Sequence, residues 1–174
     1  MSNFCQNSIT VVGEEEIIAR MFEHVRSEKA DLGKVPSPDK TKEENRIWLG
    51  LEFDYNKVVP KEGGNQWQDE HWGTRGNPMN AATWFADINE VDGVDLSVYK
   101  KPACGNIIYS SAWSPALPVT AALSKQYPEL IFTHSYFIEG GAEGSGYQVW
   151  KAGNLLEEYE DDIEDYEQED DYEE

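Results

Sequence analysis

The residues with the clearest chemistry lie at the C-terminal end of the chain, where carboxylates follow one another almost without interruption. In residues 157–174, thirteen of eighteen side chains are acidic and none is basic, so thirteen of the twenty net negative charges sit there. Such a run attracts basic surfaces and repels nucleic acid and anionic membranes. We therefore predict a basic partner protein, with no direct contact to nucleic acid or membrane. The predicted partner-binding residues are Glu157, Glu158, Tyr159, Glu160, Asp161, Asp162, Ile163, Glu164, Asp165, Tyr166, Glu167, Asp170, Asp171 and Tyr172.

The spacing of these carboxylates is close to that of phosphates. As a helix the run would span about 27 Å, with a carboxylate every ~2 Å. Fully extended it would span roughly 60 Å, with one every ~4.6 Å. Duplex DNA carries one charge per ~1.7 Å of axis, or one per ~3.4 Å of each strand. The run therefore has the charge density to occupy a groove built for DNA or RNA.

The same segment carries an apolar stripe. Leu156, Tyr159, Ile163 and Tyr166 fall on one face of a helix. Like charges at i and i+4 recur along it and cost about 2–4 kcal/mol in total, which favours a frayed segment in the free protein. We predict that residues 155–174 form an acidic tail, disordered or conditionally helical, that becomes ordered on a basic surface. Two other interpretations stay open: the tail only keeps the protein soluble, or residues 155–166 dock on the protein's own core.

Motifs for catalysis or metal binding are missing from the sequence. The three histidines lack partners at zinc-ligand spacing, and Cys5 and Cys104 stand far apart. Residues 140–146 are glycine-rich but lack the lysine of a phosphate-binding loop, so a hairpin turn is the better interpretation. We therefore expect no metal, no cofactor and no enzymatic activity.

The sequence Trp72-Gly73-Thr74-Arg75 is the best candidate for a pocket. Together with His71, the side chains of Trp72 and Arg75 would line it, and an enzyme that uses them is a weaker alternative. We prefer a structural interpretation, in which Trp72 packs in the core, Gly73 makes a turn and Thr74 caps it.

Periodicity predicts an α+β protein. The helices are expected at residues 14–27, which carry an amphipathic pattern, and at 116–126, where Ser114 would cap the first turn. The expected strands are 8–12, 47–53, 82–88, 94–99, 106–112, 130–138 and 147–151. This order predicts a ferredoxin-like sheet with two helices packed on one face, formed by residues 1–154, followed by the acidic tail.

The N-terminal sequence has neither the basic nor the apolar region of a signal peptide, and no apolar run is long enough to span a membrane. The two cysteines suit a reducing compartment. We expect the protein to act in the cytoplasm of a host cell.

Four short motifs resemble a known family. Asn3-Phe4-Cys5-Gln6-Asn7 resembles the NWCxN signature of the YubB ferredoxin-like domain, which plasmids and phages encode. Residues 53–60 resemble its FxFNxxxP segment, residues 71–75 its NWGTK, and residues 112–128 its WSPPxP…LSxxYP stretch. The resemblance covers most of residues 3–150 in the family's order, and the chain departs from it after Arg75 and in the tail. It implies a ferredoxin-like fold in a mobile genetic element and attaches no activity to it.

These two lines of argument lead to one functional hypothesis. A mobile-element protein with the charge density of nucleic acid would inhibit a host nucleic-acid-binding defence machine, a CRISPR effector or a restriction enzyme, by nucleic-acid mimicry. The alternative is a non-inhibitory, chaperone-like module that shields a basic partner protein.

Overall fold

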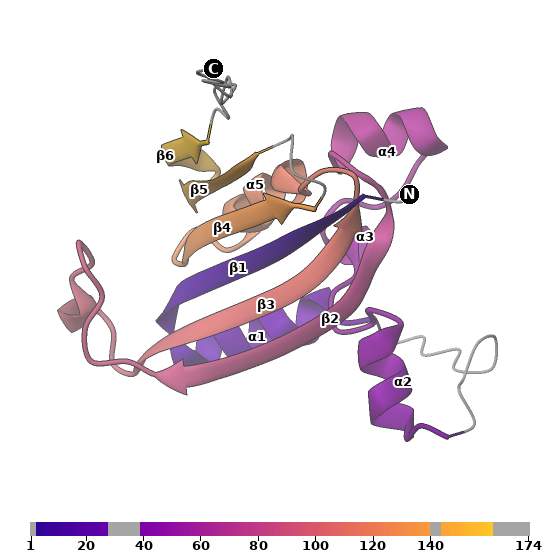
Figure 1. Cartoon of the computed structure of the whole chain (residues 1–174). Coiled ribbons are helices and arrows are strands. Elements are labelled where there is room, and N and C mark those ends of the chain that lie inside the picture. The colour runs from indigo at the N-terminus through magenta and orange to yellow at the C-terminus, as the bar shows by residue number, and fades with distance from the viewer. Residues whose placement is uncertain (1–2, 28–38, 140–143, 162–174) are drawn as a thin grey trace, which may run out of the picture.

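Six antiparallel strands form one sheet with the order β2-β3-β1-β4-β5-β6 (Figure 1). The computed structural model describes residues 3–27, 39–139 and 144–161. The strands are β1 (Phe4–Glu14), β2 (Arg75–Asp87), β3 (Pro102–Ala112), β4 (Ile131–Ile138), β5 (Ser145–Lys151) and β6 (Asn154–Glu160). The helices are α1 (Glu15–Val25), α2 (Lys42–Trp48), α3 (Tyr55–Val58), α4 (Asn65–His71), the single 3-10 turn η1 (Leu96–Val98) and α5 (Leu117–Gln126). In these ranges no helix is long and apolar enough to cross a membrane.

The N-terminal strand β1 lies at the centre of the sheet. It pairs with β3 on one side and with β4 on the other, so that Ile9 lies between Ile107 and His134. Ile9 and Val11 are fully buried, whereas Ser8 and Thr10, which alternate with them, point to the opposite face and are partly exposed. This alternation is the period of two that a half-buried strand requires.

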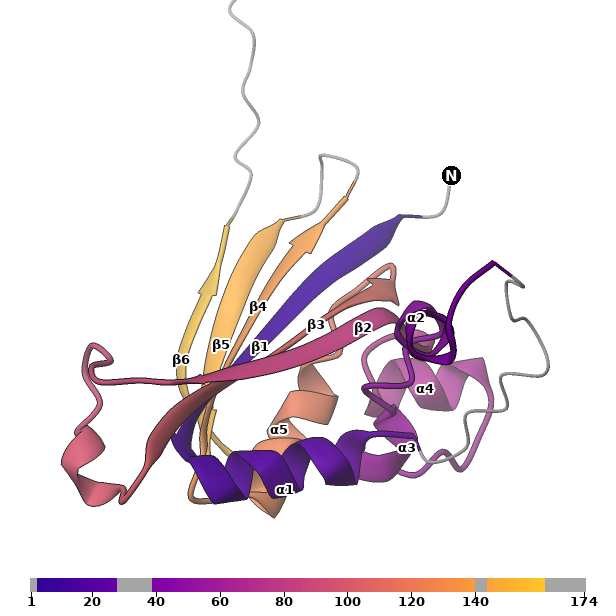
Figure 2. The ribbon, with the colours of Figure 1, turned by 90° about the horizontal axis from the view of Figure 1, so that it is seen from below.

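The helices cover the face of the sheet to which Ile9 and Val11 point. α1 packs against β1 and β3, α5 packs against β4 and β5, and Figure 2 shows both helices on the same side of the sheet. Gly105 allows the close approach of α1, because a Cβ atom at this position would lie 2.7 Å from the ring of Phe22. The expected helices at 14–27 and 116–126 are therefore confirmed with slightly shorter bounds.

An aromatic cluster fills the core beneath the end of β3. Tyr55 contacts the rings of Phe53, Trp72 and Tyr109, with centroid separations of 5.3, 5.4 and 6.0 Å. All four side chains are buried. Edge-to-face contacts of this kind add stability beyond the area that they bury, and they fix α3 and the end of α4 beneath the sheet.

Two expected strands are wrong. Residues 47–53 were expected as a strand, but Thr41 and Glu44 form a capping box that starts α2, and the helix runs to Trp48. Residues 94–99 contain η1, because the Asp95 carboxylate accepts hydrogen bonds from the Ser97 backbone N–H and hydroxyl. Local side-chain hydrogen bonds of this kind compete with strand pairing.

The sheet ends in a hairpin that the sequence analysis did not predict. Lys151 pairs with Asn154, and the two residues between them, Ala152 and Gly153, have φ of 51° and 77°. Positive φ at both central positions matches the right-handed twist of the flanking strands. The chain therefore turns back as β6, which crosses the expected boundary between a folded domain and a tail after residue 154.

Candidate functional site

The predicted partner-binding residues begin in β6. Glu157, Glu158, Tyr159 and Glu160 lie in this strand, and Asp161 follows it. All five are exposed. The remaining predicted residues, from Asp162 to Tyr172, lie outside the described part of the chain.

Side-chain contacts with β5 fix this part of the acidic run in place. The rings of Tyr147 and Tyr159 stack with centroids 5.8 Å apart, and the Tyr147 hydroxyl donates to the Glu157 carboxylate. Gln148 donates to Glu158. After the strand, the backbone N–H of Asp161 donates to the carbonyl of Ser145 at 2.8 Å.

The helical stripe is therefore wrong for the described part of the tail. Leu156 and Tyr159 belong to a strand, in which pairing with β5 satisfies the backbone groups. An extended chain also places Glu157 and Asp161, which would be i, i+4 neighbours in a helix, about 13 Å apart along the backbone, so this repulsion is relieved. Of the open interpretations, docking on the protein's own core is not what residues 155–160 show: they pair with β5 at the edge of the sheet, and none of them is buried.

The carboxylates of β6 perturb two neighbouring tyrosines. The hydrogen bond to Glu157 raises the pKa of Tyr147. Burial is the main cause that raises the pKa of Tyr136, and the charges of Glu160 and Glu158 contribute. Both tyrosines therefore stay neutral at pH 7 and add no negative charge to that of the strand.

The Trp72 corner has the structural role that we preferred. Trp72 is buried, and its indole N–H donates to the carbonyl of Val59 at 2.9 Å. Gly73 has φ of 76°, a conformation that favours glycine. Thr74 was expected to cap this turn, but its hydroxyl instead donates to the carbonyl of Ala112 at 2.5 Å, which ties the corner to the end of β3.

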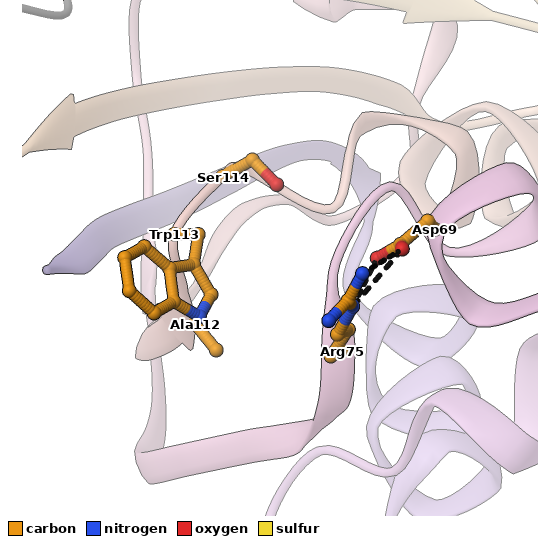
Figure 3. A pocket seen from close by; sticks show the side chains of 5 residues that line it. All are labelled: Asp69, Arg75, Ala112, Trp113 and Ser114. Atoms are coloured by element: carbon orange, nitrogen blue, oxygen red, sulfur yellow. Dashed lines mark hydrogen bonds and ion pairs between the residues drawn. The ribbon is translucent and has the colours of Figure 1, made fainter. Parts of the chain in front are cut away.

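Unlike Trp72, Arg75 faces a shallow pocket of about 280 Å³, which lies between the start of β2 and the end of β3 (Figure 3). Its guanidinium donates from Nε and Nη2 to both oxygens of Asp69, at 2.8 to 3.1 Å, and this contact raises the pKa of Arg75. Ala112, Trp113 and Ser114 form the rest of the wall.

Trp113 is the unexpected residue of this pocket. Its side chain is 56% exposed, and its φ of 71° is uncommon for a residue other than glycine. From the sequence, Trp113-Ser114 is expected only to start a helix. In the structure α5 begins later, with Ala116 as its N-cap, and the Ser114 hydroxyl donates to the carbonyl of Gly73. An exposed tryptophan beside a charge-neutralised arginine suits noncovalent contact with a flat ligand group or a partner side chain.

A buried polar network lies beneath the sheet. His134 is fully buried, with Nε2 2.9 Å from Asn7 Oδ1 and Nδ1 2.7 Å from the Thr120 hydroxyl. Because the Asn7 oxygen accepts, Nε2 carries the proton and Nδ1 accepts from Thr120. Burial lowers the pKa of His134 to about 3 and raises that of the nearby Cys5 to about 11. Both groups are neutral at pH 7, so the cysteine is not an activated thiolate.

Among residues 3–27, 39–139 and 144–161, no three His, Cys, Asp or Glu side chains lie close enough together to hold a metal ion. Asp87 ends β2, and Glu90, Asp92 and Asp95 follow it in the segment that leads to β3, at the opposite end of the sheet from the pocket (Figure 1).

Comparison with known proteins supports the fold. The crystal structure of the protein api92 from Yersinia pseudotuberculosis matches with a TM-score of 0.60 over 95% of this chain and 100% of that chain, at 9% sequence identity. At this identity the match shows the fold alone. No curated protein matches the sequence.

A family model matches more than half of the chain. It describes the ferredoxin-like domain in Api92-like protein and covers residues 84–174, from the last four residues of β2 through β6 to the end of the sequence. The ferredoxin-like fold expected from the sequence is thus confirmed. This chain belongs to the family of ferredoxin-like domains in Api92-like proteins.

Proposed function

We propose that this protein binds a basic, nucleic-acid-binding protein of its host and blocks it by placing carboxylates where phosphates would lie. The observation that carries the proposal is the exposed, ordered acidic strand. Four carboxylates in residues 157–161 follow one another along an extended backbone. At ~3.3 Å per residue this gives one charge per about 4 Å, close to the ~3.4 Å between phosphates of one DNA strand.

The strand also presents these charges at low entropic cost. Pairing with β5 fixes the backbone of β6 before any partner arrives, and ordering of a flexible segment is one of the costs of binding. Tyr159, 51% exposed, adds aromatic contact area between the carboxylates. Nine further acidic residues follow in the sequence after Asp161.

The identity of the target follows from the resemblance of the sequence motifs to the YubB family of plasmids and phages. A mobile element gains from a protein that disables host defence, so the proposed targets are CRISPR effectors and restriction enzymes of the host cytoplasm. Association through opposite charges would be fast and sensitive to salt.

The test is inhibition of DNA cleavage by purified CRISPR effectors and restriction enzymes. We expect the intact chain to inhibit at least one of them and to compete with labelled DNA in a gel shift. The variant Glu157→Gln, Glu158→Gln, Glu160→Gln, Asp161→Asn should inhibit about tenfold less, since it loses four phosphate-like charges.

A matched control removes the same number of charges elsewhere. Asp87→Asn, Glu90→Gln, Asp92→Asn, Asp95→Asn changes exposed carboxylates at the end of β2, the strand at the opposite edge of the sheet, and in the segment after it, and should inhibit like the natural chain. If both variants lose the same amount of inhibition, the inhibition depends on net charge alone, which would contradict a site at β6. Binding without displacement of DNA would favour the alternative, a non-inhibitory module that shields a basic partner.

A further inference from the structure

The outer edge of β6 has no neighbouring strand in the described part of the chain. β6 is the last strand in the sheet order, and all seven of its residues are exposed. Figures 1 and 2 show no element along its outer side. An exposed edge of this kind is a template for pairing with another chain.

The hydrogen-bond pattern identifies the free backbone groups. Asp161 donates its N–H to Ser145 of β5, so the backbone groups of Asp161 point toward β5. In an antiparallel pair, residues alternate between positions that bond to the neighbouring strand and positions that point away from it. The backbone groups of Tyr159 therefore also point to β5, and those of Glu158 and Glu160 point outward.

The opposite edge of the sheet is protected in a different way. Two register shifts interrupt the pairing of β2 with β3 around Met79, Pro78 lacks an N–H donor, and α2 packs against the strand. In β6 the register shift lies near Leu155, and residues 157–160 pair regularly and contain neither proline nor glycine. Charge alone protects this half of the β6 edge.

That charge decides which chain can pair with the edge. Two β6 strands side by side would bring the carboxylates of Glu157, Glu158, Glu160 and Asp161 from both copies together, and like charges on neighbouring strands are destabilising. A strand with lysine or arginine at alternate positions would instead form opposite-charge pairs. The net charge of −20 adds a long-range attraction for such a segment.

We propose that β6 binds an extended basic segment of the partner, which adds to the sheet as a seventh strand. The choice of a basic partner rests on the proposed function, and the inference adds the mode of binding: backbone hydrogen bonds to Glu158 and Glu160, with charge pairs along the face that carries these two side chains. A second copy of this chain and a helical basic segment do not fit the edge.

The test uses an end-capped peptide of alternating lysine and valine as the probe, with affinity measured by calorimetry. Glu160→Gln and Glu160→Pro lose the same charge, but only the proline removes an outward N–H. We expect the glutamine variant to bind up to about fivefold more weakly than the natural chain. The proline variant should lose a further ~2–10-fold, the effect of one hydrogen bond.

A second measurement leaves the protein unchanged. The same peptide, N-methylated at every residue, keeps its charge but has no N–H groups on either edge, and it should bind at least about tenfold more weakly. Bound peptide should slow amide exchange at Glu158 and Glu160 and leave Tyr159 unchanged, since its N–H already points to β5. If amide exchange at Tyr159 differs between the unbound Glu160→Gln and Glu160→Pro proteins, the proline has disrupted the strand. The comparison of the two peptides on the natural chain then tests strand addition in its place.

Two results separate this inference from the proposed function. Salt-sensitive binding of equal strength by both peptides and by both Glu160 variants would overturn strand addition and leave a charge-based contact. No binding of either peptide by the natural chain at low salt would contradict strand addition and a basic partner at β6 together.

Discussion

Among single residues, His134 gives the clearest dependence on pH. Burial lowers its pKa to about 3 in the folded protein, against 6.5 for an unperturbed histidine. Between these values the unfolded chain binds a proton that the folded chain excludes. The free energy of unfolding should therefore fall as the pH falls from about 6.5 toward 3, by about 1.4 kcal/mol per pH unit from this group.

The measurement is urea unfolding of the natural chain and of His134→Gln between these pH values. Glutamine stays neutral and can still form hydrogen bonds to Asn7 and Thr120. Because the two proteins have the same Asp and Glu residues, the titration of these carboxylates affects both alike. The stability advantage of the natural chain over the variant should shrink on acidification. Parallel pH profiles would show that His134 has the same pKa in the folded and the unfolded chain, and would contradict the prediction.

The ion pair between Arg46 and Glu52 is a second determinant at this scale. Their side chains are 17% and 10% exposed, and Arg26 lies 4.0 Å from the other oxygen of Glu52. The pKa of Glu52 is raised above its usual value, because the effect of burial exceeds the opposite effect of the positive charge of Arg26. Arg46→Met should cost about 3 kcal/mol at pH 7 by leaving a buried carboxylate with weaker compensation.

The double variant Arg46→Met, Glu52→Gln should recover much of that loss, since no buried charge is then left unpaired. Thermal unfolding of the two variants and of Arg46→Lys, which keeps the positive charge, measures the effect. A loss in the double variant equal to or larger than that of Arg46→Met would show that packing and not charge holds α2.

At the scale of elements, the β5–β6 hairpin can be strengthened at one position. Ala152 has φ of 51° before Gly153, in a two-residue turn that favours asparagine followed by glycine. Ala152→Asn should stabilise the protein by about 0.5–1 kcal/mol, and Ala152→Val should destabilise it, because a β-branched residue tolerates positive φ poorly. Urea midpoints check both, and equal midpoints would mean that the turn contributes nothing to stability.

The same hairpin shows what the sequence could and could not predict. Periodicity predicted β1, α1, α5 and β4, because their apolar residues face a core. β6 has no buried residue, and its only signal was the turn at Ala152-Gly153. The pocket beside Trp113 forms where the start of β2 meets the loop that follows β3. These segments are far apart in the sequence, so no local pattern predicts that they meet. Four of the predicted partner-binding residues fall in β6, but the acidic composition gave no information on their backbone.

For the whole molecule, the net charge of −20 opposes compaction. Salt shortens the range of this repulsion, with a Debye length of about 10 Å at 0.1 M. Raising NaCl from about 20 mM to about 300 mM should therefore increase the Tm by about 3 °C, which corresponds to roughly 1 kcal/mol. Differential scanning calorimetry measures this, and a Tm that falls with salt would mean that favourable ion pairs outweigh the repulsion.

The central position of β1 has a consequence for biosynthesis. Ser8 at the start of the chain pairs with Ile108 and Ser135, so β1 cannot find either neighbour until β3 and β4 have left the ribosome. At the usual rates of translation this takes roughly 5–20 s. During that time both edges of β1, a strand that contains isoleucine, threonine and valine, have no pairing partner. Nascent chains that stop before β3 should consequently aggregate or recruit chaperones, and the acidic strand, synthesised last, becomes ordered only after the sheet on which it lies.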